Sequence, residues 1–131
     1  MKKWFAFLSL VLIGSIMVSC YGKPGGGPLK SPAVGMALMS PSEASNKDAA
    51  NKNDEGVSHL KQEHWDVSAG HFREAIAADP NLAEAHFNLA LALDEMGDHP
   101  AATEQFKTAK DLAPGNAKIV ENEVLKKHLQ M

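Results

Sequence analysis

The chain has 131 residues, of which 44% are hydrophobic and 22% are charged, with a formal net charge of −3 at pH 7. This composition suits a chain that builds a globular core, and its acidic balance excludes the strongly basic character typical of nucleic-acid-binding domains. The single cysteine, Cys20, excludes an internal disulfide bond.

The first segment is a hydrophobic leader that ends at Cys20. Lys2 and Lys3 form a basic start, and residues 4–18 are almost wholly apolar. A basic start, a short apolar core and small residues before a cut are typical of a secretory signal peptide. Fifteen helical residues extend about 22 Å, which is short of a hydrocarbon core of about 30 Å. We therefore expect residues 1–19 to be removed rather than to span a membrane.

The lone cysteine at this cut, preceded by Met17, Val18 and Ser19, resembles the lipobox of bacterial lipoproteins. The resemblance implies that Cys20 becomes the first mature residue and carries lipid such as palmitate, so that the protein is anchored to a membrane of the bacterial cell envelope. Tyr21 stands in place of the aspartate that retains many such proteins at the inner membrane, which favours the outer membrane. The alternatives are an ordinary cleaved protein, secreted or periplasmic, and an uncleaved anchor.

Residues 20–48 are expected to form a flexible tether. Glycine and proline are frequent between Gly22 and Pro41, and serine fills much of the remainder. Glycine raises the entropy lost on ordering and proline removes a backbone donor, so this composition disfavours persistent helix or sheet. The less polar patch at residues 33–39 is interpreted as linker, and docking on the domain, on a partner or on lipid is the alternative.

The remaining segment, residues 49–131, repeats itself with an offset of 34 residues. The offset relates Phe72 to Phe106 and Pro80 to Pro114. This period, with alanine, an aromatic residue, alanine and proline at fixed places, resembles the tetratricopeptide repeat, which is a helix–turn–helix unit. The resemblance implies an all-α fold, a short right-handed α-solenoid of two helix hairpins plus a C-terminal capping helix.

The apolar residues of both repeats recur at steps of three and four, as they do in amphipathic helices. The repeats cover residues 49–82 and 83–116, and the capping helix covers 117–129. We expect five helices, over residues 48–62, 66–79, 82–96, 99–112 and 116–129. Two repeats are fewer than such stacks usually need, so a homodimer is one way to complete the stack.

The resemblance also implies a binding surface, because the first helix of each repeat in this family lines a groove that holds an extended peptide or a partner helix. The residues implied in the first repeat are Asn53, Val57, Leu60 and Lys61. Those implied in the second repeat and the cap are Glu84, Phe87, Asn88, Leu91, Asp94 and Lys118. Phe87 and Leu91 predict an apolar contact with an acidic rim.

The sequence offers little for catalysis. None of its six histidines pair at the i, i+4 spacing of a helical metal site, and it contains no glycine-rich phosphate loop followed by Lys-Ser/Thr and no nucleophile elbow. We therefore expect no enzyme activity, no cofactor and no metal, and we interpret the histidines as packing or surface residues.

The expected function is that of a lipid-anchored protein–protein interaction module of the cell envelope, with a protein or peptide partner and no nucleic acid. One alternative is a structural envelope protein that self-associates without a groove ligand. Another is a metal-binding protein built from the histidines.

Overall fold

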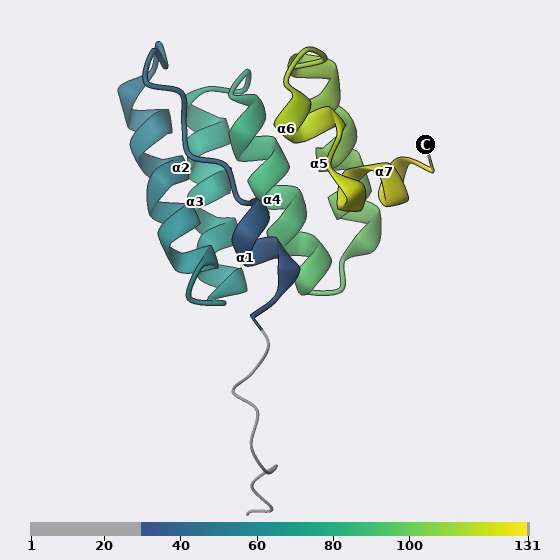
Figure 1. Cartoon of the computed structure of the whole chain (residues 1–131). Helices are drawn as coiled ribbons and strands as arrows, with labels where there is room; N and C mark the ends of the chain where they lie inside the picture. Colours follow the sequence, from purple (N-terminus) through teal and green to yellow (C-terminus); the bar gives the residue numbers. More distant parts are fainter. Residues whose placement is uncertain (1–29, 131) are drawn as a thin grey trace, which may run out of the picture.

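Seven helices follow one another along residues 30–130, which are the residues described by this computed structural model (Figure 1). Their bounds are α1 Pro32–Met36, α2 Lys47–Leu60, α3 Trp65–Ala78, α4 Ala83–Glu95, α5 His99–Leu112, α6 Ala117–Val120 and α7 Glu123–Leu129. The described range contains no strand. The leader, Cys20 and the first part of the expected tether lie outside it.

The helices form two stacked hairpins with a helical cap, as expected. Helix α2 packs on α3 and α4 packs on α5, and α3 joins the hairpins by packing on α4. The C-terminal α7 then covers α5 (Figure 1). This arrangement confirms the all-α solenoid. None of the described helices is long and apolar enough to cross a membrane.

The cap differs in detail from the single helix expected over residues 116–129. Asn116 begins α6 as expected, because its side chain accepts a hydrogen bond from the backbone N–H of Lys118. Asn122 then starts a second helix, since its side chain accepts hydrogen bonds from the backbone N–H groups of Val124 and Leu125. Asparagine is a strong helix N-cap, and this local bonding divides the cap into α6 and α7.

Both hairpins turn through one residue with a left-handed backbone. Gly97 has φ 84°, and Glu63, which is 34 positions earlier, has φ 63°. Glycine adopts this conformation without steric cost, whereas glutamate does so at some expense. The repeat therefore imposes the turn geometry even where the sequence departs from glycine.

The two helices of the first hairpin approach closely at Gly56. The ring of Phe72 is fully buried, and a Cβ atom added at Gly56 would lie only 2.5 Å from its Cε1 atom. One period later, Ala90 and Phe106 are also fully buried. The pairing of a small residue with an aromatic ring thus explains the repeated pattern in the sequence.

Substitution of Gly56 by alanine is expected to destabilise the domain by about 1–3 kcal/mol, because overpacking a close contact outweighs the gain in helix propensity. Gly70, inside α3, is the matched control, since nothing lies within 4 Å of a Cβ atom added there. Gly70→Ala is expected to stabilise by about 0.5–1 kcal/mol. Urea unfolding of the two variants measures both effects, and equal effects at the two glycines would contradict the packing argument.

Candidate functional site

The inner face formed by α2 and α4 is covered by a segment of the same chain, residues 31–40, which we name the strap. The strap begins with the short helix α1 and continues as non-helical chain through residues 37–40 (Figure 1). Ser31 starts α1 by accepting a hydrogen bond from the backbone N–H of Ala33, and Pro32 suits the first helical position. The structure therefore differs from the expected flexible tether over the strap and shows the alternative, docking on the domain.

Two buried asparagines bind the main chain of the strap. The backbone N–H of Leu38 donates to Asn88 Oδ1 over 2.8 Å, and Asn88 Nδ2 donates to the carbonyl oxygen of Leu38 over 2.7 Å. Asn53 Nδ2 donates to the same carbonyl over 3.1 Å, and Asn88 Nδ2 also donates to Asn53 Oδ1 over 2.8 Å. One side-chain amide thus pairs with both backbone groups of a single residue, as a neighbouring β-strand would.

The end of the strap is held by further hydrogen bonds to α2. The backbone N–H of Ser40 donates to Asp54 Oδ1 over 2.8 Å, and its hydroxyl donates to the carbonyl oxygen of Ala50 over 3.1 Å. The Ser40 hydroxyl oxygen also accepts from Asn53 Nδ2 over 3.1 Å. These bonds place the chain after Leu38 along the first helix of the first repeat.

The start of the strap is held at the opposite ends of the hairpins. The backbone N–H of Ser31 donates to Glu63 Oε1 over 3.1 Å, and its hydroxyl bonds to Glu95 Oε1. Glu63 is the turn residue with the left-handed backbone. The strap is therefore anchored at its start, at Leu38 and at Ser40.

Apolar burial accompanies these bonds. Ala33 is buried in the same hydrophobic cluster as four of the implied groove residues, and Met36, Ala37 and Leu38 pack against that cluster. The four groove residues are Val57, Leu60, Phe87 and Leu91. Phe87 also meets the ring of Phe106 edge-on, with centroids 5.6 Å apart. The groove is thus part of the core of the domain in this structure.

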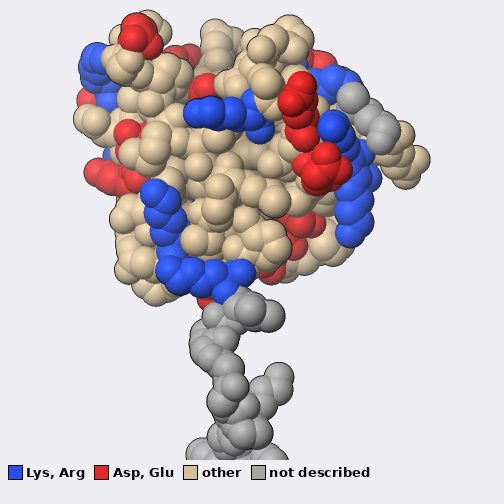
Figure 2. Space-filling view, in the orientation of Figure 1, with Lys and Arg blue, Asp and Glu red and all other residues tan. Residues whose placement is uncertain are grey.

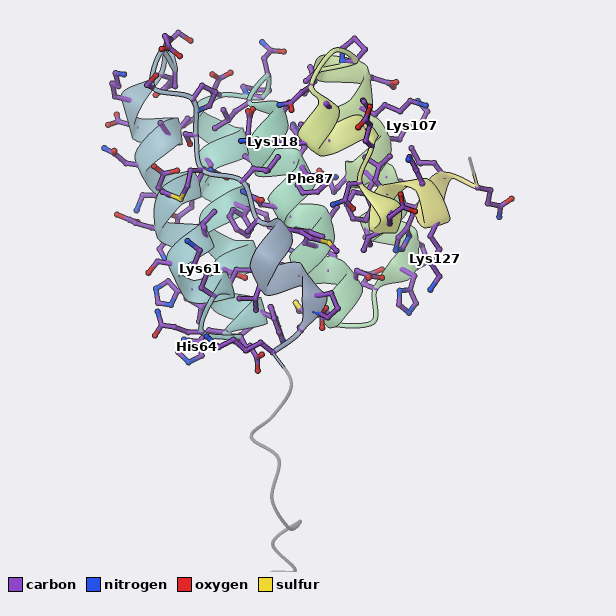
Figure 3. The ribbon with its side chains drawn as sticks, in the orientation of Figure 1. Lys61, His64, Phe87, Lys107, Lys118 and Lys127 are labelled. Carbon is purple, nitrogen blue, oxygen red and sulfur yellow. The ribbon has the colours of Figure 1, made fainter. Side chains whose placement is uncertain are left out.

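The remaining implied groove residues lie around the strap or away from it. Lys118 and Glu84 line a surface pocket with strap residues 37–40, and Lys61 lines another with Lys30, just before the strap (Figure 3). Asp94 instead pairs with two histidines, His99 and His128. Figure 2 shows this face of the molecule as a largely uncharged centre with lysine and acidic side chains at its rim.

Sequence reasoning missed the polar groups that fix the strap at its ends. These groups are Ser31, Ser40, Asp54, Glu63 and Glu95. The signal that could have found the strap is the low polarity of residues 33–39, which stands out within a segment rich in glycine, proline and serine.

Stacked helix hairpins whose first helices line a groove define an all-α helical-repeat domain. Residues 53–117 match the model of the tetratricopeptide repeat family, and this match supports the resemblance seen in the sequence. Repeats of this family suggest a protein–protein interaction module, and the family is typically non-catalytic. No curated protein and no solved structure gave a match to the chain.

Asn88→Ala is expected to loosen the strap. The backbone N–H of Leu38 would lose its acceptor, and the side-chain oxygen of Asn53 would lose the amide that donates to it. Each buried polar group left unpaired costs about 1–3 kcal/mol. Amide hydrogen exchange measured by NMR should show faster exchange at Leu38 and Ser40 than in the helices. Asn51, exposed on α2, provides the matched Asn→Ala control. Strap exchange that is the same in both variants would argue against the clamp.

Proposed function

We propose that this domain binds an extended segment of a partner protein in the groove between α2 and α4, and that the strap fills the groove until the partner displaces it. The observation that carries this proposal is the pairing of the Asn88 side chain with both backbone groups of Leu38. Main-chain groups are common to all peptides, so the clamp is suited to any extended segment whose side chains fit the surrounding surface. The proposed activity is binding without catalysis.

The strap indicates what such a segment must look like. It places small or apolar side chains, those of Ala33, Met36 and Leu38, against the hydrophobic cluster, and it places the Ser40 hydroxyl against the carbonyl oxygen of Ala50. Met39 is 53% exposed, so a partner is free to vary at the position after Leu38. We therefore assign the partner to short, weakly polar, extended sequences that resemble residues 37–40 of this chain.

Competition follows from the covalent connection of the strap. A segment on the same chain has an effective concentration of order millimolar for a short connection. A partner in trans binds only the fraction of molecules whose groove is open, so its apparent affinity is its intrinsic affinity multiplied by that fraction. The strap therefore sets a threshold, and a weakly binding segment is excluded unless its local concentration is high.

A labelled peptide of residues 31–42 tests the groove directly by fluorescence anisotropy. Leu38→Pro in the full chain removes the N–H that donates to Asn88, which should free the groove and raise peptide affinity at least tenfold. Addition of Asn88→Ala to that variant should abolish the gain. Met39→Ala is the control, because this side chain is half-exposed and should leave affinity unchanged.

Two outcomes would contradict the proposed groove. One is that the Leu38→Pro chain keeps its helical circular dichroism but does not bind the peptide. The other is that peptide binding persists unchanged when Asn88 is replaced. Self-association of the Leu38→Pro chain in light scattering, without peptide binding, would instead favour the structural envelope protein.

In the proposed function, lipid on Cys20 holds the domain at a membrane of the bacterial cell envelope, with the outer membrane favoured. The basic, apolar and small-residue pattern of the leader supports this placement. Residues 21–29 separate Cys20 from the first described residue, a length that reaches about 30 Å at full extension. Displacement of the strap would add the strap to this connection, so partner binding and the reach of the domain from the membrane would be linked.

Expression of the full chain in bacteria with a clickable palmitate analogue tests the anchor. The wild-type chain should be labelled and found in the membrane fraction, and intact mass should show residues 1–19 removed. Cys20→Ser should carry no label. A mature wild-type protein that begins at Cys20 or nearby without acyl mass would rule out the lipid and favour an ordinary secreted or periplasmic protein.

A further inference from the structure

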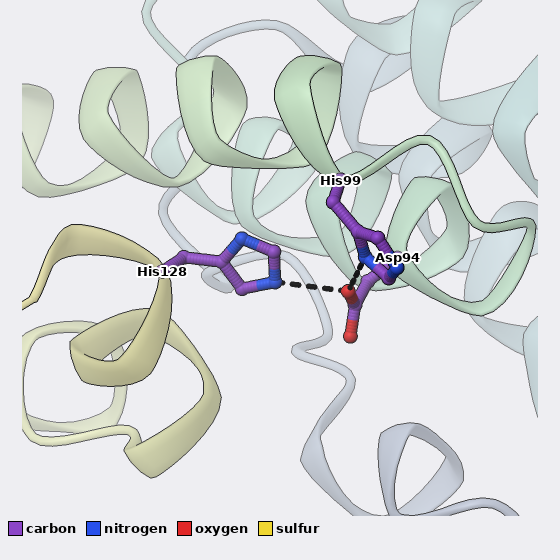
Figure 4. A group of neighbouring side chains, drawn as sticks. All are labelled: Asp94, His99 and His128. Atoms are coloured by element: carbon purple, nitrogen blue, oxygen red, sulfur yellow. Dashed lines mark hydrogen bonds and ion pairs between the residues drawn. The ribbon is translucent and has the colours of Figure 1, made fainter.

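Three potential metal ligands converge at the turn between α4 and α5. Asp94 lies in the last turn of α4, His99 is the first residue of α5, and His128 lies near the end of α7 (Figure 4). Asp94 Oδ1 is 2.7 Å from His99 Nδ1 and 2.9 Å from His128 Nε2. One ligand atom from each residue lies within 4.8 Å of those of the other two. The cluster therefore joins the second repeat to the C-terminal cap.

The turn places the backbone of Asp94, and packing holds the ring of His128. The turn is set by Gly97, which has a left-handed backbone and donates its N–H to the carbonyl oxygen of Asp94. The His128 ring packs against Phe106 with centroids 5.1 Å apart, and its side chain is only 11% exposed. His99 is 65% exposed, so its ring is free to adjust.

Thr103 determines which nitrogen of His128 faces the cluster as a ligand. The Thr103 hydroxyl donates to the carbonyl oxygen of His99 over 2.8 Å, because a carbonyl can only accept. Its oxygen is then left to accept from His128 Nδ1–H, also over 2.8 Å. Neutral His128 consequently presents the lone pair of Nε2 to the Asp94 carboxylate. Two lone pairs at 2.9 Å require a positive charge, either a proton or a metal ion.

We propose that Asp94, His99 and His128 bind a divalent transition-metal ion of the zinc type. Two imidazoles and one carboxylate are a usual ligand set for such an ion, and a second hydrogen bond that orients a ligating histidine, here from Thr103, is a usual feature of metal sites. Tetrahedral zinc holds its ligand atoms roughly 3.3 Å apart, so the Asp94 oxygen must move away from each histidine nitrogen by only about half an ångström.

The surroundings leave room for a fourth ligand. A surface cavity of about 290 Å³ lies against the cluster and is lined by Asp94, His99, Lys127 and His128. Water is the expected occupant of the open coordination position. Because the protein ligands come from α4, α5 and α7, the ion would tie the cap to the second repeat and stabilise the fold by an amount that grows with the logarithm of the free metal concentration above Kd.

Calorimetric titration of the metal-stripped full chain with Zn²⁺ in detergent tests the site. One ion per chain is expected, with a melting temperature raised by on the order of 10 °C at a hundred times Kd. His99→Gln and His128→Gln should each weaken binding at least a hundredfold. Thr103→Val should weaken it about 10–100-fold through the orientation of His128.

His64→Gln is the control, because His64 is an exposed histidine that lies beside His59, away from the proposed ligands. This variant should bind like the wild-type chain. The proposal is overturned if no saturable site appears, if His99→Gln and His128→Gln bind as tightly as wild type, or if binding is lost with His64 alone. His99→Gln keeps the test decisive even if His128→Gln unfolds, since His99 is mostly exposed.

Discussion

The hydrogen bonds between the Asn88 side chain and the main chain of Leu38 are the constraint on which the arrangement of this domain depends. Asn88 and Asn53 are fully buried, and a buried amide without partners costs about 1–3 kcal/mol. Extended main chain is what satisfies both side chains here, because Leu38 supplies a donor and an acceptor at the required spacing. A groove of this construction is therefore stable when it holds an extended segment and costly when it is dry and empty.

The composition of the strap suits this role. The strap combines one short helical turn with apolar residues, and the glycine-, proline- and serine-rich chain around it imposes no structure of its own that would compete with the conformation in the groove. Only Ala33 is buried in the core, and Met36, Ala37 and Leu38 are partly buried against it, so the strap adds less to the core than a full helix. In the proposed function this limited burial is what would let a competing segment displace it.

The sequence predicts the helices and the repeat because their signals are local. The 34-residue period that relates Phe72 to Phe106 and Pro80 to Pro114, and the three- and four-residue steps of the apolar residues, are each visible in the sequence itself. It does not predict the strap, because Leu38 and Asn88 are 50 residues apart and nothing in either segment identifies the other. The sequence does not predict the histidine cluster for the same reason. His99 and His128 lie on different helices, far apart in the sequence, and they meet only because α7 packs on α5.

The turn after α4 connects the strap to the cap. Glu95 bonds to Ser31 at the start of the strap, while its neighbour Asp94 bonds to His128 in α7. Because a stack of two repeats buries little surface by itself, both the strap and the cap contribute to a single cluster, through Ala33 and Leu125 respectively. A ligand that replaces the strap therefore replaces part of the core. An ion held at Asp94 would fix the turn from which the strap is anchored, so the two proposed sites would be coupled through adjacent residues of one helix end.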